Sequence, residues 1–186
     1  DNTLVAFFGR ANYSFMDKYM ASFILRREGS SRFGANNKWG NFPAASVGWN
    51  ISKEQFMENL TFIDNLKLRA GFGVTGNQDI ANYSSLVTME TGGVYINPDG
   101  QWRQTYGPNK NPNPNLKWER KKEYNIGADF SVLNKRLSGS LDVFKRVTND
   151  LLYNYTSQLP PFVRETIYTN VGSISNKGVE LYLNAV

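Results

Sequence analysis

Two aspartates have the pattern of a paired-carboxylate site. Asp129 and Asp142 lie on either side of the dipeptide "NK", in the segments "KEYNIGADFSVL" and "RLSGSLDVFKRV". If "NK" is the loop of a β-hairpin, Asp129 pairs with Ser140 and Asp142 with Gly127, so the two acids are diagonal neighbours roughly 7–8 Å apart. That spacing overlaps the range of the two carboxylates in an inverting glycosidase. A solvated wall that also holds Arg146 fits the same pattern, and we favour that interpretation over catalysis.

The stretch "GFGVTG", Gly71–Gly76, has the G-x-G-x-x-G spacing of a loop that binds a dinucleotide pyrophosphate. Its surroundings do not support that function. A nucleotide-binding strand is buried on both faces and continuously apolar, whereas this one carries Lys67 and Arg69. The segment after it is rich in Asn, Ser, Thr and Gly, so no helix N-terminus is expected to face a phosphate. We expect the first two glycines on the polar face of a strand, and Gly76 and Asn77 in the turn that ends it.

Two further stretches combine aromatic with polar or charged residues. The segment "VYINPDGQWRQTYGPNKNPNPN" holds Tyr95, Trp102 and Tyr106, which suit sugar or peptide binding but equally suit packing within the loop or contact with a partner protein. The run "KWERKKEYN" is basic and aromatic, as nucleic-acid-binding surfaces are. Glu119 and Glu123 interrupt it, and its charges alternate between both faces of a strand. We therefore expect a rim that contacts anionic lipid headgroups or solvent, and no nucleic-acid partner.

The composition removes most other chemistry. The 186 residues contain no histidine and no cysteine, which excludes thiol nucleophiles, serine–histidine triads, and zinc or haem sites with His or Cys ligands. Any metal site would need oxygen ligands alone. The net charge of +5 is compatible with an anionic surface as a partner. We expect no catalytic residues, no metal and no cofactor.

The elements that must position these residues are strands. Seven runs alternate between apolar and polar residues, which is the period of a strand with one apolar and one polar face. They begin near residues 4, 18, 39, 65, 122, 136 and 177. Phe144 is an exception, an aromatic residue on a polar face. Most runs hold the alternation for ten residues or more, whereas soluble strands usually have about 5–6 and strands that cross a bilayer need about 9–11.

The connections alternate between short turns and long loops, as in outer-membrane barrels with periplasmic turns and extracellular loops. One medium link, "SKEQFMEN", has room for a helical turn. The sequence therefore predicts an all-β chain that forms an antiparallel transmembrane β-barrel segment. Aromatic residues near strand ends would lie at the membrane interface, namely Trp39, Trp118 and Tyr124. The polar face would line the lumen and include Lys67, Arg69, Asp129, Asp142 and Arg146.

Seven strands are too few for a closed membrane barrel, because the smallest known have about eight and an open edge in lipid leaves backbone groups unpaired. We therefore expect residues 1–186 to be one part of a larger barrel domain. Two alternatives stay open. One is a secreted, soluble β-sandwich that binds carbohydrate through Trp102 and its neighbours, and the other is a passive outer-membrane porin.

Five blocks of the sequence resemble one protein family. They are "LRREGSSRFG", "WGNFPAASVGWNISKEQFM", "NLKLRAGFGVTGNQ", "NPNLKWERKKEYNIGADFSVLNKRLSGSLDVFKR" and "NVGSISNKGVELYLNA". In this order, and over most of the chain, they resemble the barrel of SusC/RagA-type TonB-dependent outer-membrane transporters. The chain has "REGSS" where the family often has Asp-Gly, and Gly71 where Ser is common. Neither departure touches function.

The resemblance implies a bacterial outer-membrane location and a barrel of roughly 22 strands that is plugged by an N-terminal domain. It also implies a SusD-like surface lipoprotein as a lid, the TonB complex as the source of energy, and lipid and lipopolysaccharide around the barrel. The implied substrates are glycans or oligopeptides. The plug, the TonB box and the C-terminal strands are not among these residues, so we expect a section of the barrel that cannot import on its own.

Overall fold

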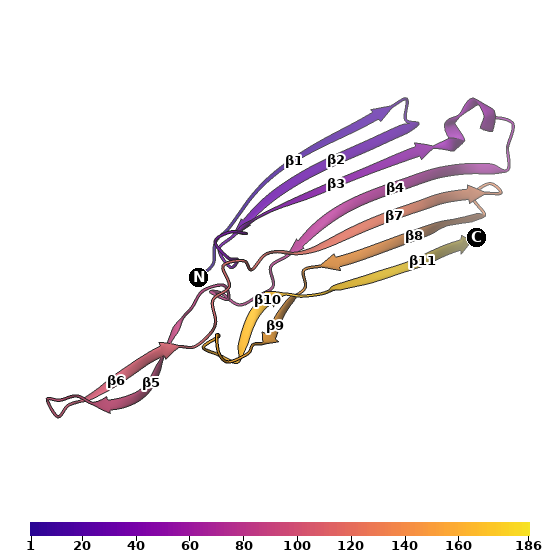
Figure 1. Cartoon of the computed structure of the whole chain (residues 1–186). Helices are drawn as coiled ribbons and strands as arrows, with labels where there is room; N and C mark the ends of the chain where they lie inside the picture. The colour runs from indigo at the N-terminus through magenta and orange to yellow at the C-terminus, as the bar shows by residue number, and fades with distance from the viewer.

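Seven long strands form one sheet in the computed structural model, which describes residues 1–186 (Figure 1). They are β1 (Leu4–Phe15), β2 (Tyr19–Ser30), β3 (Trp39–Asn50), β4 (Ile63–Asn77), β7 (Glu119–Val132), β8 (Leu137–Asn149) and β11 (Ser173–Ala185). Each has 12 to 15 residues, which is enough to cross a bilayer. All seven runs predicted from the alternation are strands.

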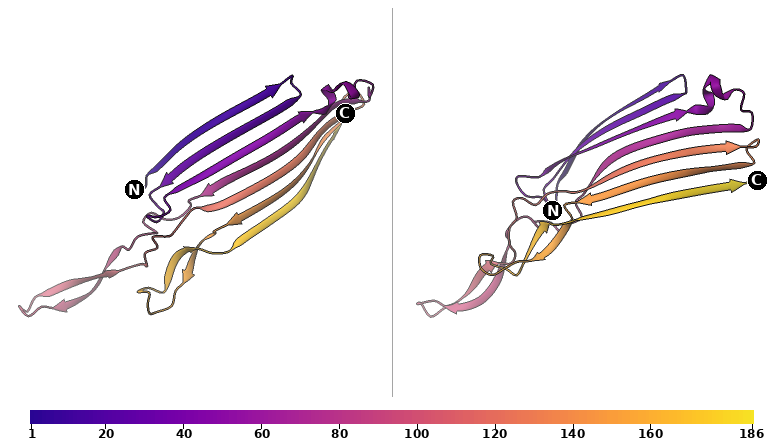
Figure 2. Two further views of the ribbon diagram at one scale, coloured as in Figure 1. Left: turned by 45° about the horizontal axis from the view of Figure 1, so that its top comes forward. Right: turned by 45° about the vertical axis from the view of Figure 1, so that its right-hand side comes forward.

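The sheet is antiparallel, with the strand order β1-β2-β3-β4-β7-β8-β11. Neighbours in the sheet therefore follow one another along the chain, apart from two small hairpins within the loops. β1 and β11 are the two edges, so these strands form a curved, open wall (Figure 2). The wall is one segment of a barrel, as the sequence predicted.

Short connections gather at one end of the sheet. The β1–β2 turn uses left-handed backbone conformations at Met16 and Asp17, and the β7–β8 turn uses them at three successive residues from Leu133. Between β3 and β4 lie two 3₁₀ turns, η1 (Ile51–Lys53) and η2 (Gln55–Met57), where the sequence predicted one helical turn. No helix in the structure combines the length and hydropathy that a membrane span requires.

The long loops at the other end contain two hairpins that the sequence analysis did not predict. One is formed by β5 (Met89–Ile96) and β6 (Trp102–Pro108), and the other by β9 (Leu152–Thr156) and β10 (Thr166–Asn170). Both extend beyond the end of the wall, the first of them farthest (Figure 1). Gly100 at the tip of the first hairpin has φ of +78°, a conformation that glycine adopts without a steric cost.

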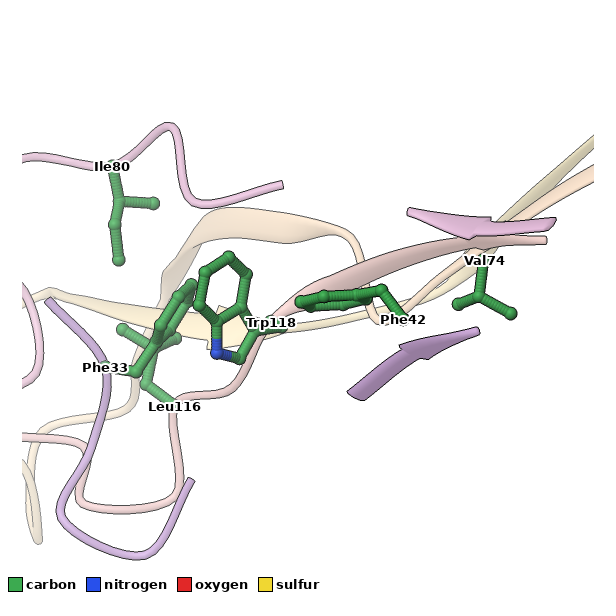
Figure 3. Close-up of a cluster of buried hydrophobic side chains, with 6 residues drawn as sticks. All are labelled: Phe33, Phe42, Val74, Ile80, Leu116 and Trp118. Atoms are coloured by element: carbon green, nitrogen blue, oxygen red, sulfur yellow. The ribbon is translucent and has the colours of Figure 1, made fainter. Parts of the chain in front are cut away.

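Only 15 of the 186 residues are buried, and six of these are hydrophobic. The six form one cluster where the long loops meet the sheet (Figure 3): Phe33, Phe42, Val74, Ile80, Leu116 and Trp118. Trp118 is 3% exposed, so its predicted place at the membrane interface is wrong, because its ring packs between Phe33 and Phe42.

No second sheet covers the apolar face of the wall, and the β-sandwich alternative is therefore wrong as well.

Candidate functional site

The strand register divides the wall into two chemically different faces. Residues opposite one another on paired strands share a face, and one such row crosses all seven strands with apolar side chains only: Tyr13, Ala21, Val47, Ala70, Ile126, Val143 and Val179. Ile126 and Val179 are each 66% exposed. A continuous exposed apolar surface of this kind, on strands long enough to cross a bilayer, is typical of the lipid-facing side of a membrane barrel. The neighbouring row on the opposite face is mostly polar or small: Ser14, Met20, Gly48, Arg69, Gly127, Asp142 and Glu180.

Aromatic residues are present on the apolar face close to the long loops. Trp39, the first residue of β3, stacks on Phe7 of β1 with 6.3 Å between ring centroids. The guanidinium of Arg27 lies 5.3 Å from the Trp39 ring. Tyr124 packs against Phe72 at 5.0 Å. Of the three aromatic residues predicted at the interface, Trp39 and Tyr124 lie on the face that suits this role.

Arg69 holds two aspartates on the polar face. Its Nε donates to Oδ2 of Asp129 at 2.8 Å, and its Nη2 donates to Oδ1 of the same carboxylate at 2.9 Å. Nη2 also reaches Oδ2 of Asp142 at 3.1 Å. Gly127 lies between Arg69 and Asp142 in the register, and a Cβ there would overlap both side chains. Glycine at this position therefore lets the guanidinium cross β7.

The predicted hairpin register is confirmed, because Asp129 pairs with Ser140 and Asp142 with Gly127. The two carboxylates accept hydrogen bonds from one shared guanidinium. These contacts fit the wall of charged side chains that we favoured, although the cation bound to both aspartates is Arg69 and not Arg146.

A second ion pair lies on the same face nearer the long loops. Nε of Arg146 is 3.1 Å from Oε1 of Glu123, and Nζ of Lys121 is 3.6 Å from Oε2 of that glutamate. The Arg146 guanidinium also lies 4.4 Å from the centroid of Phe144. The Phe144 ring lies over Gly178 of β11. Phe144, the aromatic residue that broke the alternation, is thus held between the Arg146 guanidinium and Gly178.

Small residues separate the two ion-pair groups and leave the polar face hollow. A depression of about 530 Å³ includes Lys67, Arg69 and Gly48 in its lining, and a neighbouring one of about 310 Å³ includes Lys121 and Glu123. Both depressions are lined by Ser22, Ser46, Gly71 and Asn125. The five residues predicted to face the lumen share the polar face: Lys67, Arg69, Asp129, Asp142 and Arg146. Of these, Lys67 and Arg69 line the larger depression.

The glycine motif lies entirely within a strand. Gly71 and Gly73 occupy the polar face, opposite Asn125 and Glu123 of β7. The prediction that Gly76 and the next residue form a turn is wrong, because β4 continues through both and Gly76 pairs with Arg120. A Cβ on Gly76 would overlap the ring of Phe42, so this glycine makes room for the loop core.

The three loop aromatics lie on the β5–β6 hairpin but not on one face of it. Trp102 is paired with Ile96 and Tyr106 with Thr91, whereas Tyr95 is paired with Arg103 on the opposite face. The face of Trp102 and Tyr106 is mostly apolar, with Thr91 and Gln104 as its polar members. The two aromatic residues are 68% and 66% exposed. This face also carries Met89, Val94 and Ile96, each at least 59% exposed.

The repeat "NPNPN" joins separate loops, a role that the sequence analysis missed. Asn111 is 2% exposed. Its Nδ2 donates to the carbonyls of Arg164 and Thr166 at 2.7 and 2.9 Å, and its Oδ1 accepts from the backbone of Val163 at 3.1 Å. Asn113 donates to the carbonyl of Tyr168 at 2.8 Å. The alternating Asn-Pro spacing is the one sequence signal that could have pointed to this segment.

A curved antiparallel wall with a lipid-facing apolar surface and a charged opposite surface defines a segment of an outer-membrane β-barrel. The family model described as "TonB dependent receptor-like, beta-barrel" matches residues 1–185. The TonB-dependent receptor SusC of Bacteroides thetaiotaomicron is 38% identical over 186 residues, covering 99% of this chain and 18% of the receptor. The TonB-dependent receptor P39 of Formosa agariphila is 39% identical over 188 residues, covering 99% and 17%.

Solved structures agree with the sequence comparisons. A chain in the structure of the RagAB peptide transporter superposes with a TM-score of 0.86 at 30% identity, covering 99% of this chain and 20% of that one. The chain therefore belongs to the TonB-dependent receptor β-barrel family and is of the SusC/RagA type. It spans about a fifth of the length of these relatives. Its location is the bacterial outer membrane.

Proposed function

We propose that residues 1–186 are a section of the barrel of a SusC-type importer that takes up glycans or oligopeptides across the outer membrane. The observation that carries this proposal is the polar face of the wall, where charged pairs and depressions lie opposite an exposed apolar face that suits lipid. In this role Lys67, Arg69, Asp129, Asp142 and Arg146 line the lumen. The match to SusC and to a peptide transporter over nearly the whole chain supports the same function.

Two partners belong to the proposal. A SusD-like lipoprotein would cover the long-loop end, where the apolar face of the β5–β6 hairpin offers Trp102 and Tyr106 to it or to the substrate. The TonB complex would supply energy through a plug and a TonB box that belong to the same polypeptide outside residues 1–186. No catalysis is part of the proposal, and the binding of Asp129 and Asp142 to one arginine supports this.

Uptake by cells that carry the full-length gene tests this function. Labelled oligosaccharide and oligopeptide pools are offered to cells with the gene, to cells without it, and to cells in which TonB is inactivated. We expect uptake of one of the two classes to require both the gene and TonB. Uptake that requires the gene but continues without TonB would show a passive porin instead. Equal uptake in all three strains would contradict transport of either class.

A further inference from the structure

Exposed apolar side chains gather at the short-turn end of the wall. Met16 in the β1–β2 turn is 70% exposed, Phe56 and Phe62 in the β3–β4 link are 63% and 55% exposed, and Leu133 in the β7–β8 turn is 56% exposed. No buried cluster lies near them, since the hydrophobic core is at the opposite end. Turns that face only water are normally built from polar residues. Three successive connections thus carry apolar groups without a packing role inside the chain.

Each of these connections also carries a lysine. Lys18 follows Met16 in the first turn, Lys53 precedes Phe56 in the link, and Lys135 follows in the third turn. The ammonium of Lys18 is 3.1 Å from Oε2 of Glu54, and that of Lys53 is 3.6 Å from Asp17. An apolar side chain beside a long cationic one is the composition of segments at a membrane surface, where the amine stays among headgroups.

The link is attached to the lipid-facing side of the wall by one carboxylate. Glu54 accepts a hydrogen bond from the hydroxyl of Tyr19 at 2.7 Å and one from Nε1 of Trp49 at 3.0 Å. These two rings stack with centroids 6.4 Å apart, and Trp49 pairs with Leu68 on the apolar face. The link therefore lies beside the last lipid-facing row rather than across the lumen, and Figure 1 shows its coils beyond the end of β3.

We propose that residues 51–62 are an interfacial segment that lies in the periplasmic leaflet of the outer membrane. Phe56 and Phe62 enter the boundary between headgroups and acyl chains, while the half-exposed Lys53 reaches the phosphates of phospholipid headgroups and Lys18 stays bound to Glu54. Lipid is the partner that fits this segment, because the link continues the lipid-facing surface of the strands. Tyr19 and Trp49 belong to that surface, and both donate hydrogen bonds to Glu54 in the link. The proposal depends on the barrel orientation and not on what the protein imports.

Spin labelling of the full-length protein tests the proposal. Cysteine is introduced singly as Phe56→Cys or Phe62→Cys, in a background without other reactive cysteines, and the nitroxide-labelled protein is reconstituted into vesicles of phosphatidylethanolamine and phosphatidylglycerol. Power saturation then compares access of oxygen, which concentrates in lipid, with access of a neutral nickel chelate, which stays in water. Gln101→Cys at the tip of the β5–β6 hairpin is the matched exposed control. Because positions 56 and 62 are labelled separately, one of them still reports if the other variant misfolds.

We expect the ratio of oxygen to nickel access at positions 56 and 62 to exceed the ratio at position 101 severalfold. A ratio equal to that of the control would place the link in water and overturn the proposal. Low access of both reagents would also overturn it, because it would show that a protein surface covers the link. Uptake plays no part in the measurement, so its outcome is independent of the import function.

Discussion

Removal of the buried amide at position 111 should release the β9–β10 hairpin from the rest of the loops. Asn111→Ala leaves the backbone N–H groups of Val163 and Arg164 without their acceptor. It also removes the Nδ2 donor to the carbonyls of Arg164 and Thr166, although the Arg164 carbonyl keeps a hydrogen bond from the Ser157 hydroxyl. A buried donor that loses its partner costs about 1–3 kcal/mol. Because Val163 and Arg164 are exposed residues whose hydrogen bonds to Asn111 are only partly buried, we take about 1.5 kcal/mol, in the lower half of that range, for each of the two N–H groups, or about 3 kcal/mol in total.

That loss should appear as faster local hydrogen exchange. Each ~1.4 kcal/mol is a factor of ten in an equilibrium constant, so amides of residues 157–170 should exchange on the order of a hundred times faster in the variant. Hydrogen–deuterium exchange with mass spectrometry on the detergent-solubilised, full-length protein measures this. Peptides from β7 and β8 should keep their rates, because their ladder does not involve Asn111.

The control substitution is Asn115→Ala, in the same "NPNPN" repeat. The Asn115 side chain accepts one exposed hydrogen bond, from Nδ2 of Asn36 at 2.9 Å, so its loss should cost about 0.5 kcal/mol and change exchange less than about threefold. Equal acceleration in the two variants would refute the reasoning, since burial would then not decide the effect. Unchanged exchange of residues 157–170 in Asn111→Ala would refute it as well.

Three other substitutions probe the wall, the hairpin and the link. Arg69→Met should lower the free energy of unfolding of the barrel by about 1–2 kcal/mol relative to Arg69→Lys, because only Met leaves two partly exposed carboxylates without a cation. Equal melting temperatures of the two variants would contradict the ion-pair interpretation. Trp102→Ala should reduce the amount of the proposed SusD-like lipoprotein recovered in a detergent pull-down, while Tyr95→Ala on the other face of the hairpin should not. Equal losses in the two variants would argue against binding through the face of Trp102. Hydrogen bonds from Tyr19, Trp49 and Lys18 hold the pKa of Glu54 below its ordinary 4.5. The contribution of the Glu54 carboxylate to the stability of the folded state is therefore present above pH 4.5, and it is lost as the pH falls through the lower pKa of the folded state. The difference in stability between wild type and Glu54→Gln should therefore disappear on acidification, and a difference that is constant with pH would exclude this contribution.

The sequence predicted the wall because a barrel strand obeys one simple rule. Each residue faces either lipid or lumen, so alternation alone places Arg69 and Asp129 on one face and Ile126 on the other. The β7–β8 register followed from the turn. The contact of Arg69 with both aspartates was not predicted, because it depends also on the β4–β7 register and on the space that Gly127 leaves. The β5–β6 hairpin has a signal in "NPDG", a turn between two alternating segments, although we expected only a loop there.

The alternation rule fails where the wall stops being a single layer. Pairing of β3 with β4 ends at Ala44 and Gly73, and beyond that point Phe42 is 3% exposed although it follows the parity of the polar face. Its ring meets Trp118 edge-on at 5.2 Å and occupies the space that Gly76 leaves open. This core is set by contacts between segments about 30 to 85 residues apart, and no local period in the sequence records such contacts. The polar face of the wall was therefore predictable from the alternation, whereas the loop end, which would meet substrate and lipoprotein, is positioned by packing and by buried amides that only the folded structure reveals.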